Sequence, residues 1–302
     1  MAVHPDVAGL LATLGVDAAA DPAIGAVVLT GLEPVVPTTL PLGRAAATVF
    51  GAVGALAARL HHSRTGQTQD VSLRADHSAA SMSPDIVLDG QDGQAMRAGT
   101  AAGIPESEKQ YNALRLALMG VFQCGDGKSV FLHGSFNPEQ CVAFFNLPDG
   151  FTRGDIAERV ISWPSAFELE EAAAAENLCC NVIRSYDEWV ASPVGAALAA
   201  TPVIEIVKLA DGPPVPLPAS NRDQLRPLSG VRCLDLARVL AGPMCARTFA
   251  EHGADVLKVA NKDLPDMRPF QIETGQGKRC CHLDIKTPEG KVSPLRNLAA
   301  LE

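Results

Sequence analysis

The segment that most constrains the fold is residues 228–290, LSGVRCLDLARVLAGPMCARTFAEHGADVLKVANKDLPDMRPFQIETGQGKRCCHLDIKTPEG. Residues 231–236 are largely apolar, as expected of a strand that is covered on both faces. Pro243 suits the first turn of the helix that follows, because its missing N–H is not needed there. Residues 255–260 predict the next strand. A strand, helix and strand within about 30 residues form a βαβ unit, which implies a parallel sheet with a right-handed crossover.

Such a unit offers a place for phosphate, because the helix N-terminus presents free N–H groups and the positive end of the helix dipole. Five basic residues occur in this segment: Lys258, Arg268, Lys278, Arg279 and Lys286. They predict either a phosphate-rich ligand or a solvated, charged surface. The turn after the first strand is not GxGxxG, which argues against a dinucleotide such as NAD.

Composition narrows the class of protein. The 302 residues are 47% hydrophobic and carry a net charge of −9, so general affinity for nucleic acid or membranes is not expected. Apolar stretches are broken before about 18 residues, so no membrane span is expected, and the N-terminus lacks the features of a signal peptide. The eight cysteines include no CxxC pair, which predicts reduced thiols in a cytoplasmic protein and no zinc site.

The remaining sequence predicts further elements. Residues 44–62 indicate a helix rich in small side chains, and residues 70–73 a short strand. Residues 121–134 predict a β-hairpin, because two β-rich runs flank an Asp-Gly turn. Residues 136–198 indicate mainly helix, whereas residues 84–120 are polar and show no clear pattern.

The C-terminal segment resembles the opening of the family III CoA-transferases, which include formyl-CoA transferase, carnitine CoA-transferase and α-methylacyl-CoA racemase. The resemblance is carried by LDLARVLAGP, DMR and GKRCCHLDIKTPEG. It departs from the family at residues 259–260 and 275–277. The resemblance implies that six residues line a CoA site: Arg238, Leu240, Ala241, Arg268, Leu283 and Lys286.

The front of the chain resembles later parts of the same family, in RTGQTQDVSL and CCNVIRSYDEWVASP. The family's segments thus occur in permuted order. The expected fold class is α/β, with a Rossmann-like open parallel sheet unit and a smaller α+β domain. The expected organisation is residues 1–83 as a helical and α/β segment resembling the middle of the family, 84–210 as the smaller α+β domain, 211–227 as a linker with five prolines, 228–292 as the start of the Rossmann-like CoA-binding domain and 293–302 as a tail.

The resemblance also implies a catalytic aspartate that attacks the acyl-CoA thioester. In the racemase branch, an Asp works with a His at the α-carbon. The family's glycine spacing is matched by Gly25 and Gly31, and the residue eight positions before Gly25 is Asp17, with Asp21 as the second candidate. A lone Asp before an alanine run also fits a helix N-cap. For His77, as for His133, a structural or surface role is the alternative to a chemical one.

Two family segments, an N-(F/Y)-x-P-G loop and a GYG-type turn, do not occur in this sequence. Three interpretations stay open: a truncated form of a longer two-part transferase, a permuted enzyme completed by a partner subunit, or a catalytically silent relative.

The leading expectation is an enzyme that transfers CoA between carboxylic acids or racemises a 2-methylacyl-CoA. The alternatives are a silent CoA-binding or dimerisation relative and a dinucleotide-binding oxidoreductase. The resemblance implies acyl-CoA and a carboxylic acid as ligands, a homodimer that is interlocked in relatives, and no metal or cofactor besides CoA.

Overall fold

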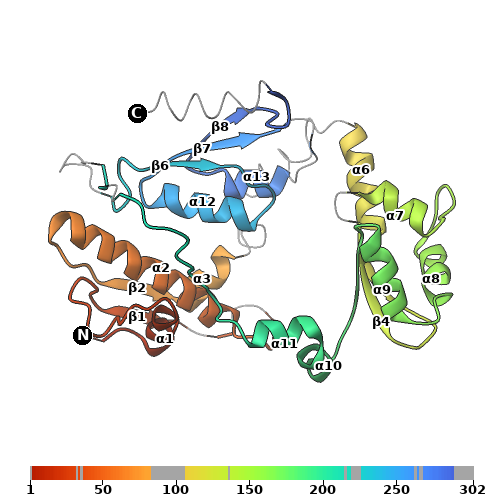
Figure 1. The fold of residues 1–302 in the computed structure, drawn as a ribbon, viewed down its shortest axis with the longest axis horizontal. Helices are drawn as coiled ribbons and strands as arrows, with labels where there is room; N and C mark the ends of the chain where they lie inside the picture. Colours follow the sequence, from red (N-terminus) through yellow and green to blue (C-terminus); the bar gives the residue numbers. More distant parts are fainter. Residues whose placement is uncertain are drawn as a thin grey trace. The chain divides into compact units, whose positions relative to one another are not determined.

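The computed structural model describes residues 2–31, 33–34, 37–82, 106–134, 137–213, 216–218, 226–261, 264 and 268–288, apart from the side chains of residues 108, 268 and 269. The chain is a mixed α/β protein with parallel and antiparallel sheets. It divides into two compact units (Figure 1). One combines residues 1–100 with residues 203–302, and the other comprises residues 101–202.

The first unit contains the βαβ segment expected from the sequence. Its elements are β6 (Arg232–Asp235), α12 (Ala241–Glu251), β7 (Asp255–Ala260), α13 (Arg268–Thr274) and β8 (Lys278–His282). The three strands are parallel in the order β6-β7-β8. Helix α12 lies along the sheet (Figure 1) and packs its small side chains, Ala246 and Ala250, into an apolar cluster with Val256. The predicted parallel βαβ unit is therefore confirmed.

The same unit holds a second, two-stranded parallel sheet. Its elements are α1 (Pro5–Thr13), β1 (Val27–Thr30), α2 (Leu42–Thr65), β2 (Val71–Arg74) and α3 (Ala75–Ser81). Helix α2 is rich in small residues because other elements approach it closely: a Cβ on Gly51 would lie 2.7 Å from Cγ2 of Val7, and one on Gly54 would lie 2.8 Å from Cγ1 of Val71. The expected helix and strand are confirmed, whereas the sequence reading did not identify α1 or β1.

A single side chain ties the end of α2 to the later part of this unit. The guanidinium of Arg64 donates to the carbonyl oxygens of Pro227 at 2.8 Å, Pro218 at 2.9 Å and Ser229 at 2.9 Å. These carbonyls belong to the proline-rich segment and to the turn before β6. The Arg64 side chain thus provides hydrogen-bond donors to three backbone carbonyls that receive none from a helix or a sheet.

The second unit is an antiparallel sheet covered by helices. Its elements are α6 (Glu106–Ala117), β3 (Gly120–Gln123), β4 (Ser129–His133), α7 (Pro138–Phe144), α8 (Arg153–Ile161), α9 (Ala166–Ala175), β5 (Cys179–Val182), α10 (Tyr186–Ala191) and α11 (Pro193–Ala199). The predicted hairpin is present as β3 and β4. Its turn is stabilised by Asp126, which accepts hydrogen bonds from the N–H groups of Lys128 at 3.0 Å and Ala166 at 2.9 Å.

The core of the second unit lies on one face of this sheet. Residues alternate between buried and exposed along β4, with Val130 and Leu132 completely buried and Phe131 exposed. Helices α8 and α9 add Ile156 and Leu169 to the same cluster. Helix α6 lies in a region for which the sequence predicted no pattern. Among the helices that the structure describes, none is long and apolar enough to cross a membrane.

Candidate active site

The turn between β6 and α12 is built around the last residue of the strand. Asp235 is buried, and its Oδ1 accepts a hydrogen bond from the N–H of Ala237 at 3.0 Å. Val239 has a φ of 73°, which is unusual for a β-branched residue. A Cβ on Gly242 would lie 2.3 Å from Cβ of Ala237, so glycine allows the helix to begin this close to the turn. The result is a tightly folded connection directly above the end of the strand.

The N-terminus of α12 has no side-chain cap, because Leu240 precedes it and offers no acceptor. The first N–H groups of an α-helix have no partner within the helix, and the dipole adds partial positive charge at this end. The 11-residue helix α12 therefore presents N–H donors at the carboxyl edge of the parallel sheet, where anions bind well.

An ion pair fixes the base of this site. Nζ of Lys278 lies 2.8 Å from Oδ2 of Asp235 and 2.6 Å from the carbonyl oxygen of Pro243. Lys278 begins β8, Asp235 ends β6 and Pro243 lies in the first turn of α12. The single ammonium group thus joins both outer strands of the sheet to the helix that covers it. Two buried opposite charges with additional hydrogen bonds form a specific and tightly constrained connection.

Lys258 places a second buried cation beside this pair. Lys258 lies opposite Asp235 in the pairing of β6 with β7, so both side chains point to the same face of the sheet. Lys258 is 6% exposed, and no ion pair or hydrogen bond joins its ammonium to the described residues. With Lys278 and Asp235 neutralising each other, the charge of Lys258 gives this group of three residues a net charge of +1.

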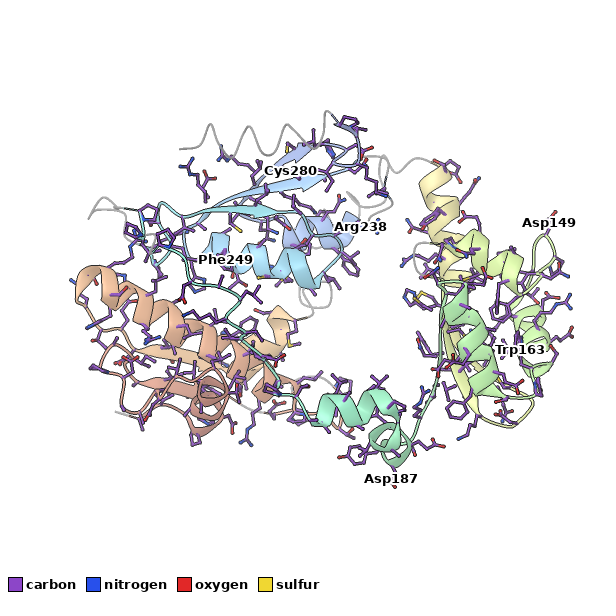
Figure 2. All side chains as sticks on the ribbon, viewed as in Figure 1. Asp149, Trp163, Asp187, Arg238, Phe249 and Cys280 are labelled. Atoms are coloured by element: carbon purple, nitrogen blue, oxygen red, sulfur yellow. The ribbon has the colours of Figure 1, made fainter. Side chains whose placement is uncertain are left out.

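The sequence implied a set of residues that line a CoA site. Those whose positions the structure describes lie at this edge of the sheet. Arg238, Leu240 and Ala241 are exposed and follow one another through the turn into α12. Figure 2 labels Arg238 in this turn. Leu283 continues the pairing of β8, since its N–H donates to the carbonyl of Ala260 at 2.8 Å. Lys286 is exposed three residues later. The carboxyl ends of parallel strands meet at one edge of a sheet. The topology therefore brings the turn after β6 to the same edge as the residues that follow β8.

The basic residues Arg268, Lys278 and Arg279 differ in how far they are available to a ligand. Arg268 begins α13, but its side chain lies outside the described residues. Arg279 pairs with Asp255, with distances of 3.1 Å from Nε and 2.5 Å from Nη2. Because Lys278 and Arg279 are both engaged in ion pairs, the set of cations free for a ligand is smaller than the sequence suggested. Asp235 was not among the residues predicted for this site, and its place at the end of a predicted strand is the signal in the sequence that could have identified it as the partner of Lys278.

The two candidate aspartates lie before β1. Asp17 is exposed, and its Oδ1 accepts hydrogen bonds from the N–H groups of Ala19 and Ala20 at 3.2 Å each. Asp21 pairs with Arg59 at 2.7 Å and accepts from the N–H of Ala23 at 2.9 Å. Both carboxylates therefore stabilise turns. Residues 18–20 form a turn and not a helix, so Asp17 is not the helix N-cap that the sequence offered as the alternative to catalysis. This role in a turn leaves the exposed carboxylate of Asp17 accessible to a ligand.

The other side chains singled out from the sequence fall elsewhere. His77 is exposed on α3, in the first unit, and His133 ends β4 in the second unit. Within the described parts of the chain, no group of three or more His, Cys, Asp or Glu side chains could hold a metal ion.

Known proteins resemble this chain over most of its length. The family described as CoA-transferase family III matches residues 10–218 and 228–300. Acetyl-coenzyme A transferase nodX of Hypoxylon pulicicidum is 26% identical over 264 residues, which cover 78% of this chain and 44% of that protein. An acyl-CoA transferase of Gibberella moniliformis is 24% identical over 274 residues, which cover 84% and 48%. The chain therefore spans about half the length of these relatives.

Shorter segments resemble other proteins. Succinate–glutarate CoA-transferase of Agrobacterium fabrum is 39% identical over 82 residues, covering 21% of this chain and 20% of that protein. A solved structure of a CAIB/BAIF family protein from Brucella suis is 32% identical, with a TM-score of 0.19 and coverage of 22% of each chain. The family model matches most of the chain, so this chain belongs to CoA-transferase family III.

Proposed function

We propose that this chain binds a CoA thioester at the carboxyl edge of the β6–β7–β8 sheet and takes part in transferring CoA between carboxylic acids. The observation that carries the proposal is the uncapped N-terminus of α12 at the same edge of the sheet as Lys258, a buried cation that none of the described residues neutralises. CoA carries a diphosphate and a 3′-phosphate, and both helix N-termini and cations favour phosphate. Residues 228–292 would form the start of a Rossmann-like CoA-binding domain.

The side chains around this edge suit different parts of CoA. Arg238 and Lys286 would bind phosphate oxygens, and Arg268 would add a third cation. The apolar surface of Leu240, Ala241 and Leu283 would pack against the adenine and the pantetheine arm. Leu240 is 41% exposed, which is a high value for a large apolar side chain and fits a surface that a ligand covers.

The proposed chemistry uses a carboxylate as nucleophile, with Asp17 in that role and Asp21 as the alternative. The carboxylate attacks the thioester carbonyl and releases CoA thiolate, which leaves a mixed anhydride. The thiolate then attacks the aspartyl carbonyl and releases the first carboxylic acid. The acceptor carboxylate attacks the resulting aspartyl-CoA thioester and releases CoA thiolate, which leaves a second mixed anhydride. The thiolate attacks the acceptor acyl carbonyl of this anhydride, which forms the new acyl-CoA and releases the aspartate carboxylate. Covalent catalysis of this kind divides one difficult transfer into easier steps. Racemisation of a 2-methylacyl-CoA is the other reaction proposed for the same site.

Assembly belongs to the same proposal. Since the chain spans about half the length of its longer relatives, a homodimer would bring a second set of segments to each site. The proposal requires no metal and no cofactor other than CoA itself.

Calorimetric titration with CoA tests the binding part of the proposal. We expect Lys258→Met, Arg238→Met and Lys286→Met each to weaken binding about tenfold, which corresponds to about 1.4 kcal/mol. Arg279→Met is the matched control, because Arg279 pairs with Asp255 and should leave the affinity unchanged. Absence of CoA binding to the unmodified chain, or stabilisation by NAD(P) instead of CoA, would contradict the proposal.

Trapping tests the chemical part. The chain is incubated with acyl-CoA and then with hydroxylamine, which converts an activated aspartyl group to a hydroxamate that mass spectrometry can locate. We expect the modification at Asp17, and its loss in Asp17→Asn. CoA binding without any modified aspartate would instead indicate a silent CoA-binding relative.

A further inference from the structure

A second buried cation lies in the other unit, and the described residues offer it no ion pair. Arg115, in the last turn of α6, is 8% exposed. Its Nε is completely buried and finds no hydrogen-bond acceptor in the part of the chain that the structure describes. The ion pairs described in residues 106–202 join other residues, namely Lys109 with Glu106, Lys128 with Glu188 and Arg184 with Glu170. Among the described residues, therefore, no carboxylate pairs with the Arg115 guanidinium.

This arrangement is unfavourable for the protein alone. A guanidinium cannot lose its proton in a protein, so burial cannot be relieved by neutralisation. A buried guanidinium nitrogen without an acceptor carries a desolvation cost that exceeds the favourable interaction of a cation with a helix C-terminus. The position of Arg115 at the end of α6 consequently does not explain its burial.

Close packing holds Arg115 beside the end of β4. A Cβ on Gly134 would lie 2.7 Å from the carbonyl oxygen of Arg115 and 3.1 Å from its Cα, so glycine is needed for the strand end to meet the helix. His133 precedes this glycine, and the pKa of its imidazole is lowered, first by burial and then by the charge of Arg115. The charge of Arg115 thus acts on β4, and His133 near neutral pH does not add a second cation.

We propose that Arg115 is the binding site for a carboxylate monoanion, at the junction between the end of α6 and the end of β4. The planar guanidinium presents parallel N–H donors that match the two oxygens of a carboxylate. One cation beside a neutral imidazole suits a single negative charge better than a phosphate dianion. A free small carboxylic acid is the ligand to which we commit, and an acidic side chain of a second copy is the other source of the same group.

The inference does not rest on the proposed function. Every residue that carries it belongs to the unit of residues 101–202, whereas the proposed CoA site belongs to the other unit. A failure of either site would therefore leave the other unaffected.

The test is a titration of the full chain, labelled with ¹⁵N-arginine, with sodium acetate and sodium succinate at constant ionic strength. We expect the Arg115 Nε–H signal, identified by its absence in Arg115→Met, to shift saturably at millimolar carboxylate. Arg115→Lys keeps the positive charge but loses the parallel N–H donors of the guanidinium. We expect this variant to bind the carboxylate at least tenfold more weakly. Arg159→Met is the matched control, since Arg159 is an exposed arginine of the same unit and its replacement should change nothing.

Thermal unfolding of the same variants separates binding from a structural role. Tryptophan fluorescence monitors this unit, because both tryptophans, Trp163 and Trp189, lie in it. Without ligand, Arg115→Met should unfold at the same or a higher temperature than the unmodified chain, and only the unmodified chain should gain stability from succinate. The absence of any saturable shift in the unmodified chain would overturn the proposal. If Arg115→Met then also unfolds at a lower temperature, the role of Arg115 is structural. If dilution alone alters the Arg115 signal and sedimentation shows self-association, the carboxylate comes from a second copy.

Discussion

Lys278 and Asp235 form an ion pair in which both side chains are 1% exposed and Nζ lies 2.8 Å from Oδ2. The two residues are separated by 43 positions in the chain. Their contact joins the start of β8 to the end of β6, across the intervening strand β7. Because the same ammonium also reaches the carbonyl of Pro243, the pair determines where α12 begins relative to the sheet.

Replacing the lysine should therefore destabilise the first unit strongly. We expect Lys278→Met to lower the free energy of unfolding by about 3–5 kcal/mol, because it leaves the Asp235 carboxylate buried without its partner. The double variant Asp235→Asn, Lys278→Met should lose less than Lys278→Met alone. Urea unfolding followed by far-UV circular dichroism measures the difference.

The control for that experiment is Arg279→Met, at the position next to Lys278 in β8, which removes a surface pair with Asp255 of β7. The Arg279 side chain is 70% exposed, so the expected loss is below about 1 kcal/mol. If Lys278→Met and Arg279→Met lower the free energy of unfolding equally, burial of the Lys278–Asp235 pair does not make it more important for stability than a surface pair.

Val239 offers a test of backbone strain in the turn above this pair. A β-branched residue at a φ of 73° is strained, and glycine adopts this conformation freely. We expect Val239→Gly to raise the free energy of unfolding by about 1 kcal/mol, since relief of strain exceeds the greater entropy of glycine in the unfolded chain. Chemical denaturation measures it. Val203→Gly, at an exposed position without a positive φ, should be neutral or slightly destabilising.

Cysteine reactivity should follow burial. Burial raises the pKa of the Cys180 thiol to about 12 and that of Cys141 to about 11, so neither forms the reactive thiolate near neutral pH. Cys179, Cys245 and Cys280 are exposed. We expect these three to react first with a thiol-specific reagent in the native protein, with mass spectrometry identifying the sites. Modification of Cys180 at a comparable rate would contradict the described packing.

The second unit should lose stability in acid through Glu170. Hydrogen bonding to Arg184 is the main cause that lowers the pKa of Glu170, and the N–H of Val182 contributes at 2.8 Å. A lowered folded-state pKa means that the stabilisation is present above the unfolded pKa, about 4.3 for glutamate, and is lost as the pH falls further.

We therefore expect Glu170→Gln to lower the free energy of unfolding by about 2 kcal/mol at pH 7, as for a lost hydrogen bond to a charged group. The difference from the unmodified chain should shrink as the pH falls below 4. Tryptophan fluorescence during urea unfolding monitors this unit. Glu168→Gln, at an exposed position in the same helix, is the control, and a pH-independent difference would contradict the role of the carboxylate.

Much of the fold could be predicted because the relevant patterns are local. The hairpin of β3 and β4 follows from an Asp-Gly turn between β-rich runs, and the βαβ unit follows from two apolar runs on either side of Pro243. Helix α2 was visible from its long run of small residues. In the hairpin and in the βαβ unit, residues close in sequence make the decisive interactions, and in α2 the run of small residues is itself local.

The parts that escaped prediction depend on distant partners. Strand β1 forms its ladder with β2, with Val27 opposite Val71, and neither short strand shows how it will pair. Lys278 was read as one of several cations for a ligand, since only the folded sheet brings Asp235 to it. Arg115 lies in a helix that showed no clear pattern, and its burial depends on the close approach of Gly134.

The three carbonyls bound by Arg64 have a consequence for biosynthesis. They lie 154 to 165 positions after the arginine. A ribosome must therefore extend the polypeptide beyond residue 229 before this end of α2 acquires its acceptors. Residues 101–202, which form their own compact unit, emerge earlier. The middle of the protein is then expected to mature first, whereas the end of α2 acquires these acceptors only after the final quarter of the chain has emerged.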